Sequence, residues 1–183
     1  MSPDTSSGVN SGANPSGKPG ANAGANPSAN PDIKPVLILG VGNLLLKDEG
    51  VGIHFVQQLQ KKSLPPDVEV LDGGTRGLDL LMLMEGRRLV VVVDCARLGE
   101  KPGTVRVFGP KDILPEKNRG FSVHGLNLAS ALEFGERLGT LPEIFIVGVE
   151  PESIEIEIGL SDAVRKALPV IQQTVDEILT RNR

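Results

Sequence analysis

The sequence predicts an α/β fold of three layers, α/β/α, in which helices cover both faces of a mostly parallel, twisted sheet of about five strands. Three observations support this prediction. Apolar runs of strand length alternate with helical stretches from Val36 onward, as they do in βαβ units. The runs 36–41 and 89–93 are apolar almost without interruption, which is typical of strands buried on both faces. Residues 104–108 instead alternate apolar and polar side chains, which predicts a half-exposed edge strand, and we expect this strand to be antiparallel.

The expected strands span residues 36–41, 68–71, 88–93, 104–108 and 143–149. Helices are predicted between them from the spacing of apolar side chains. Residues 50–62 have helical spacing and precede two prolines, whereas residues 78–84 are apolar along nearly their whole length and should be well buried. Residues 126–138 form the third helix. The fourth, which Ser161 caps and which ends near Leu179, carries a single apolar stripe.

Composition limits the class of protein. Of the 183 residues, 39% are hydrophobic and 23% are charged, as in ordinary globular domains. The net charge of −4 argues against a nucleic-acid partner, because such proteins need a basic face to neutralise phosphates. The single cysteine cannot form an internal disulfide, and no stretch approaches the ~20 apolar residues of a membrane span. We therefore expect a cytoplasmic protein without a membrane-spanning segment.

The chain is predicted to consist of two parts. Residues 1–34 form a low-complexity tail dominated by Asn, Ser, Gly, Pro and Ala. Such a composition buries too little apolar surface to offset the entropy lost on ordering, so we expect this tail to be disordered. Residues 35–183 form a single α/β domain, which we expect to be a monomer.

Three side chains with metal-binding chemistry lie where the predicted parallel strands end. Glu49 follows the first strand, Asp94 closes the third, and His124 precedes the third helix from a loop. In open α/β sheets, ligands bind beyond the carboxyl ends of the strands. Carboxylate oxygen and imidazole nitrogen suit a borderline divalent cation such as nickel or zinc. The sequence therefore predicts a metal site formed by these three residues.

Simpler interpretations stand beside this one. The helix dipole favours acidic residues at a helix N-terminus, which suits Asp48 well and could account for Glu49. Asp94 could cap a helix or pair with Arg97. The segment Asp72-Gly73-Gly74-Thr75 is, on its own, best interpreted as a turn.

The other reactive side chains are assigned to surface or structural positions. His54 lies five residues after Glu49, on a different face of the first helix, and is expected at the surface or facing a partner. Cys95 has no base beside it in the sequence, so we expect a small buried thiol. No Ser-His-Asp or Cys-His arrangement is evident, which disfavours an acyl-enzyme mechanism.

A nucleotide-binding protein is the runner-up function. Gly40 and Gly42 follow the first strand as in the dinucleotide-binding fingerprint, and Asp72 ends the second strand, where a ribose-binding acid would lie. Leu45 occupies the place of the third glycine, so the fingerprint is incomplete.

Several motifs, in this order, resemble the hydrogenase maturation endopeptidase family. They are Gly40-Val41-Gly42-Asn43-Leu44-Leu45, Asp48-Glu49-Gly50-Val51-Gly52, Asp72-Gly73-Gly74-Thr75, the strand ending at Asp94, and His124-Gly125-Leu126. The resemblance runs over residues 36–168, and segments 147–152 and 158–161 also match. Val123 departs from the family pattern, which has Pro or a polar residue there, and the N-terminal tail is not a family feature.

The resemblance implies an endopeptidase that removes the C-terminal extension of a nickel–iron hydrogenase large-subunit precursor once nickel has been inserted. It implies that Glu49, Asp94 and His124 contact the metal, and that Asp72 handles the substrate or takes part in cleavage, so that these four residues form the catalytic set. The precursor would supply nickel as the recognition handle, and zinc or another divalent ion could substitute. A non-catalytic hydrogenase assembly chaperone is the remaining alternative.

Overall fold

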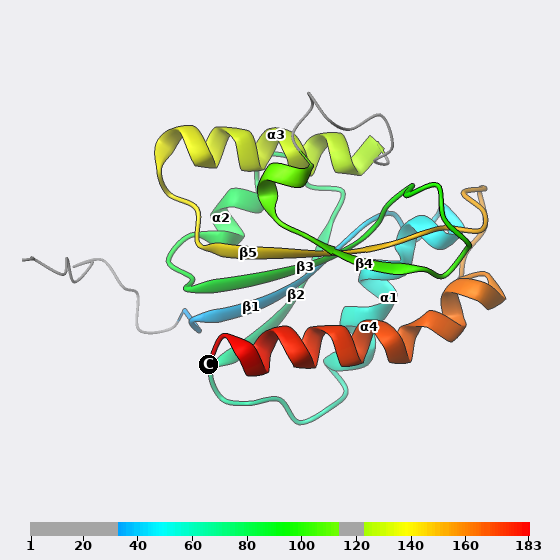
Figure 1. Cartoon of the computed structure of the whole chain (residues 1–183), viewed down its shortest axis with the longest axis horizontal. Coiled ribbons are helices and arrows are strands. Elements are labelled where there is room, and N and C mark those ends of the chain that lie inside the picture. Colours follow the sequence, from blue (N-terminus) through cyan, green and yellow to red (C-terminus); the bar gives the residue numbers. More distant parts are fainter. Residues whose placement is uncertain (1–32, 114–122) are drawn as a thin grey trace, which may run out of the picture.

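The computed structural model describes residues 33–113 and 123–183, with only the backbone described for residues 123–127. A five-stranded sheet in the order β2-β1-β3-β5-β4 forms the centre of the domain (Figure 1). Strands β2, β1, β3 and β5 are parallel, and β4 pairs with β5 in the antiparallel direction. The predicted fold class, including its antiparallel edge strand, is confirmed. The strands are β1 (Val36–Val41), β2 (Val68–Gly74), β3 (Leu89–Cys95), β4 (Val105–Phe108) and β5 (Glu143–Val149).

The helices form the two outer layers. Helices α1 and α4 pack on one face of the sheet, and α2 and α3 on the other (Figure 1). The elements are η1 (Lys47–Gly50), α1 (Val51–Leu59), α2 (Leu80–Met84), η2 (Pro110–Asp112), α3 (Val123–Leu138) and α4 (Asp162–Arg181). None of the helices in the described ranges combines the length and apolar character that crossing a membrane requires.

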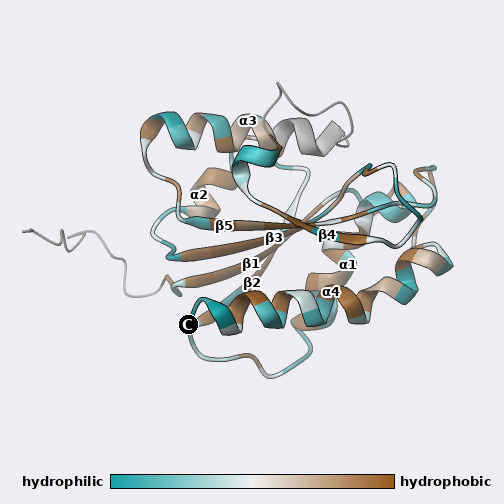
Figure 2. Ribbon diagram, viewed as in Figure 1, coloured by the Kyte–Doolittle hydropathy of each residue, from teal (hydrophilic) through white to brown (hydrophobic). Residues whose placement is uncertain are grey.

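Strand β3 shows why uninterrupted apolar runs predict the centre of the sheet. All of its residues are buried. Val91 and Val93 belong to the core beneath α1 and α4, whereas Val90 and Val92 belong to the core beneath α2 and α3. Because successive side chains point to opposite faces, a strand covered on both faces must be apolar at every position. In Figure 2, β1 and β3 are accordingly brown, whereas α3 and α4 carry teal residues.

Two glycines allow α1 to pack directly against the sheet. A Cβ at Gly40 would lie 2.3 Å from the carbonyl oxygen of Gly52, and a Cβ at Gly52 would lie 2.1 Å from the carbonyl oxygen of Val93. Both distances are far below van der Waals contact, so neither position tolerates a side chain without movement of the backbone. Gly40 thus lies within β1 and has a packing role, which removes the main observation behind the nucleotide-binding alternative.

Several predicted boundaries require correction. Strand β2 continues through Gly74, so the turn predicted at Asp72-Gly73-Gly74-Thr75 begins only at the end of this segment, where Gly74 has a φ of +55° and Thr75 forms a turn; the register with β1 shifts between Gly40 and Val41. Helix α1 ends at Leu59 and is preceded by the 3₁₀ turn η1. Helix α2 is less buried than expected, because Met82 is 74% exposed. The predicted tail, residues 1–34, lies almost entirely outside the described residues, and the domain division stays a prediction.

Candidate active site

Two buried carboxylates meet at the carboxyl edge of the sheet. Glu49 lies in η1, which follows β1, and Asp94 lies near the end of β3; η1 and β3 are in contact. Asp94 is completely buried and Glu49 nearly so. The alternatives for Asp94 are wrong, since no helix begins at the end of β3 and no ion pair in the described structure joins Asp94 to Arg97.

Asp94 is incompletely hydrogen-bonded. Its Oδ1 accepts a 2.8 Å hydrogen bond from the backbone N–H of Cys95. Its Oδ2 is buried and has no hydrogen-bond partner among the described residues. A buried polar atom without a partner costs free energy, so such an atom marks a position where a ligand, a water or an ion would be stabilising.

The electrostatics of Asp94 follow from this environment. Its pKa is raised to about 8, mainly by burial and to a smaller extent by the charge of Glu49, while the hydrogen bond from the Cys95 N–H acts in the opposite direction. At neutral pH the Asp94 carboxyl therefore holds a proton, which a cation bound beside the two carboxylates would displace. The pair can thus serve either as a cation site or as a source of one proton.

The predicted third ligand is placed by its backbone alone. His124 lies in the first turn of α3, which begins at Val123, and not in a loop before the helix. Its side chain lies outside the described residues, so its contact with Glu49 and Asp94 stays a prediction. Among the side chains that are described, no group of three or more His, Cys, Asp or Glu is arranged to hold a metal.

Asp72 lies apart from the carboxylate pair. It is exposed on β2, its Oδ1 accepts a 2.8 Å hydrogen bond from the N–H of Gly74, and its neighbour in the sheet is Gly40 on β1. Val70 packs beneath α1 and α4, so alternation directs Asp72 to that face. Val92 packs beneath α2 and α3, so Asp94 points to the opposite face. The structure therefore brings Glu49 and Asp94 together and leaves Asp72 two strands away from Asp94.

Asp48 is a site residue that the sequence did not reveal. It is completely buried. Its Oδ2 accepts hydrogen bonds from the N–H groups of Glu152 (2.9 Å) and Ser153 (3.0 Å), and its Oδ1 accepts one from Ser161 (2.7 Å). Asp48 thereby ties η1 to both ends of the loop between β5 and α4. Its partners lie more than a hundred positions away in the chain, so no local pattern could have identified this role.

Glu150, which directly follows β5, fixes a second loop through backbone hydrogen bonds. It is buried, and its Oε2 accepts hydrogen bonds from the N–H groups of Leu98 and Glu100. Its own carbonyl accepts a 2.9 Å hydrogen bond from Gly103 N–H. The loop that follows Asp94 is thus fixed by a carboxylate from the neighbouring strand.

The remaining reactive side chains are structural. Cys95 is free and buried, as predicted, and burial together with the nearby carboxylates raises the pKa of its thiol. His54, predicted at the surface or facing a partner, is half-buried, and its Nε2 is inaccessible and has no hydrogen-bond partner among the described residues. Burial, with a smaller effect from the charge of Arg165, lowers the pKa of His54.

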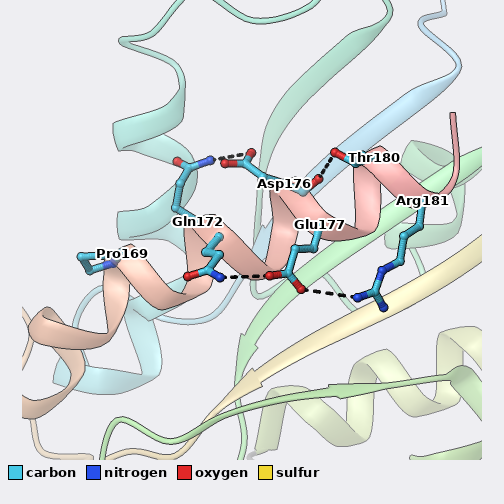
Figure 3. Close-up of a pocket in the computed structure, with 7 residues that line it drawn as sticks. Pro169, Gln172, Asp176, Glu177, Thr180 and Arg181 are labelled. Atoms are coloured by element: carbon cyan, nitrogen blue, oxygen red, sulfur yellow. Dashed lines mark hydrogen bonds and ion pairs between the residues drawn. The ribbon is translucent and has the colours of Figure 1, made fainter.

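A hollow on the outer face of α4 is unrelated to the carboxylate pair. It has a volume of about 420 Å³ (Figure 3). Its polar side chains pair along the helix, as in the 3.0 Å hydrogen bond from Gln172 to Asp176 and the 3.7 Å ion pair between Glu177 and Arg181. These are ordinary pairs of an exposed helix face, and we assign no function to this hollow.

The chain is similar to known proteins of one family. A family described as hydrogenase maturation protease matches residues 53–178. The chain is 37% identical over 145 residues to the hydrogenase 2 maturation protease of Escherichia coli K12, an alignment that covers 76% of this chain and 88% of that protein. It is 34% identical over 140 residues to a putative hydrogenase maturation protease of Methanocaldococcus jannaschii, covering 74% of this chain and 90% of that protein.

Solved structures are similar as well. The hydrogenase maturating endopeptidase HybD from Escherichia coli superimposes with a TM-score of 0.69 at 35% identity, covering 80% of this chain and 93% of that one. The nickel–iron hydrogenase maturation protease HybD from Thermococcus kodakarensis superimposes with a TM-score of 0.58 at 29% identity, covering 76% of this chain and 97% of that one.

Proposed function

Because the chain belongs to the hydrogenase maturation protease family, we propose that it is an endopeptidase that removes the C-terminal extension from the large-subunit precursor of a nickel–iron hydrogenase. The family match covers most of the folded domain. One observation of this chain carries the proposal beyond the family: a fully buried carboxyl, Asp94, has an oxygen without a hydrogen-bond partner among the described residues, beside a second carboxylate at the ligand-binding edge of the sheet.

We further propose that the precursor's nickel is the recognition handle. Nickel is here part of the substrate, not a resident cofactor, and zinc or another divalent ion could substitute. The donors fit such an ion, since one oxygen of Asp94 has no hydrogen-bond partner among the described residues, and Glu49 adds negative charge to the same place. His124, at the start of α3, is the proposed third ligand.

The chain's own groups would act as follows. Docking of a cation at Glu49 and Asp94 favours the ionised form of Asp94, which releases the proton that burial otherwise keeps on this carboxyl. The free-energy cost of an ionised carboxylate at this buried position is then offset by its interaction with the precursor's nickel. The site therefore discriminates against a precursor without nickel. Asp72, exposed at the end of β2, is proposed to handle the substrate outside the metal position. A cytoplasmic location and a monomeric state remain predictions.

The test compares two forms of one precursor. Purified protein is incubated with nickel-loaded or nickel-free large-subunit precursor, and the C-terminus is followed by mass spectrometry. We expect shortening of the loaded precursor alone. Equal cleavage of both forms would contradict the role of nickel, and cleavage of neither would favour the assembly chaperone.

A further inference from the structure

The loop between β5 and α4 exposes large aliphatic side chains beside the site. Ile156 is 91% exposed and Ile158 is 75% exposed. Leu45, which is 60% exposed, lies next to this loop, because its carbonyl accepts a 3.1 Å hydrogen bond from Glu157 N–H. Figure 1 shows this loop beside the segment that leads from β1 into α1. We refer to Leu45 and residues 155–158 as the exposed edge.

The exposed edge is held firmly in place. Leu46 forms an isolated parallel bridge with Glu157, Lys47 N–H donates a 2.7 Å hydrogen bond to the Glu157 carbonyl, and the Lys47 ammonium forms a 2.8 Å ion pair with the Glu157 carboxylate. Lys47 has a φ of +47°, a conformation that residues other than glycine seldom adopt. Asp48 then fixes the start and end of the loop through its three backbone hydrogen bonds. Exposed apolar side chains on a fixed backbone are typical of a binding surface.

The sequence of this segment is that of a strand whose pairing is incomplete. Residues 154–158 read Ile-Glu-Ile-Glu-Ile, a strict alternation that favours β structure. In the structure the backbone bends at Ile156 and Ile158, and of residues 154–158 only Glu157 is paired. The backbone N–H and C=O groups of Ile156 and Ile158 form no hydrogen bond with the described residues. These groups are free to form main-chain hydrogen bonds with a bound peptide.

Charge indicates the kind of peptide that fits. Glu152 and Glu155 are exposed, and neither forms an ion pair within the described part of the chain, whereas the charge of Glu157 is matched by Lys47. A partner with apolar side chains at alternate positions and a basic residue nearby would complement this surface.

We propose that the exposed edge binds the C-terminal segment of the hydrogenase large-subunit precursor through apolar contacts and main-chain hydrogen bonds. This inference rests on the proposed function and specifies how the substrate is held. The edge continues directly into η1, since Leu45 is separated from Glu49 by three residues. A peptide paired with Ile156 and Ile158 is therefore delivered next to the carboxylate pair, and Asp48 is the positioning residue that joins the two.

The test is steady-state processing of nickel-loaded precursor by the full-length chain and by the double variant Ile156→Gln/Ile158→Gln. We expect KM to rise about tenfold or more, since two exposed isoleucines lose their burial against the substrate, while kcat and the urea midpoint stay unchanged. The matched control is Met82→Gln/Val170→Gln, which removes two exposed apolar side chains from α2 and α4 and should leave KM unchanged.

A second variant, Glu152→Gln/Glu155→Gln, tests the role of charge. It should raise KM at low salt and weaken the salt dependence of KM.

The outcomes separate this inference from the proposed function. If the unaltered chain processes the precursor and the isoleucine variant has an unchanged KM, docking at the exposed edge is refuted and the proposed function stands. If the unaltered chain fails to process nickel-loaded precursor, the proposed function itself is refuted. If the unaltered chain sediments as a dimer that the isoleucine variant dissociates, the edge binds a second copy, and the proposal is overturned.

Discussion

Asp48 and Asp94 are two aspartates with the same burial and opposite surroundings. Both are completely inaccessible to solvent. Asp48 accepts three backbone hydrogen bonds from one loop, whereas Asp94 accepts one and keeps an oxygen without a partner among the described residues. Burial alone therefore does not identify a functional carboxylate. What distinguishes the two is whether the fold has already satisfied the charge.

These two aspartates contribute differently to the protein. The hydrogen bonds of Asp48 are charge-assisted and stabilise the fold. Asp94 is a cost to the fold, because a buried carboxyl without full compensation is driven to its neutral form. We therefore expect substitutions at the two positions to separate activity from stability.

The largest effect is expected on activity from Asp94→Asn. The amide keeps the shape but cannot ionise to bind a cation, so processing of nickel-loaded precursor should fall by about a hundredfold or more. The unfolding free energy at pH 7 should be unchanged or higher, because the variant has no buried acid to neutralise. Processing assays and urea unfolding measure the two quantities. Full activity in this variant would remove Asp94 from the proposed site.

The converse is expected for Asp48→Asn. The amide nitrogen is a donor facing backbone donors, so part of the network is lost and the unfolding free energy should fall by about 2–4 kcal/mol. Asp79→Asn is the matched control, because Asp79 is exposed and makes no side-chain cap hydrogen bond to α2; it should change the stability by less than about 0.5 kcal/mol. A neutral outcome at Asp48 would show that the loop is held by other contacts.

The sequence predicts one member of this pair far better than the other. Asp94 follows five apolar residues, and this local contrast marks a charge at the edge of a core. Asp48 has no such mark, because its partners come from a loop that only the tertiary fold brings near. The local sequence pattern therefore identifies a carboxylate that ends an apolar strand. It does not identify a carboxylate whose role depends on hydrogen bonds to backbone groups far away in the sequence.

The same distinction explains which parts of the fold could be predicted. The periods of strands and helices are local, so the sheet, its antiparallel edge and the Ser161 cap of α4 are confirmed. The Asp72-Gly73-Gly74 segment is locally typical of a turn, but pairing with β1 extends the strand through it. The partial burial of His54 depends on packing around α1, including the nearby Arg165, which spacing within α1 does not reveal.

A separate effect is expected in the pH dependence of stability. The pKa of Asp94 is raised from its ordinary 3.8 to about 8 in the folded protein. The folded state then binds more protons than the unfolded state between these values, so the contribution of this group is present below about pH 4 and is lost as the pH rises to about 8. The unfolding free energy of the unaltered chain should therefore fall relative to that of Asp94→Asn, by up to about 1.4 kcal/mol per pH unit across this window. Urea unfolding at several pH values measures it, and a constant difference would show that Asp94 is ionised in the folded protein throughout this range.

The smallest effect is expected at Cys95. A substitution there removes the thiol but keeps the backbone hydrogen bond to Asp94, so it tests the two contributions separately. The hydrogen bond to Asp94 comes from the Cys95 N–H, which Cys95→Ala retains. The buried thiol has a raised pKa, so it stays protonated and inaccessible and should not react with a thiol reagent until the protein unfolds. We expect Cys95→Ala to process precursor within about twofold of the unaltered chain, at a cost of about 1 kcal/mol in stability from the lost packing. A large loss of processing with normal folding would instead assign chemistry to the sulfur, and Asp94 would then share its proposed role with its neighbour.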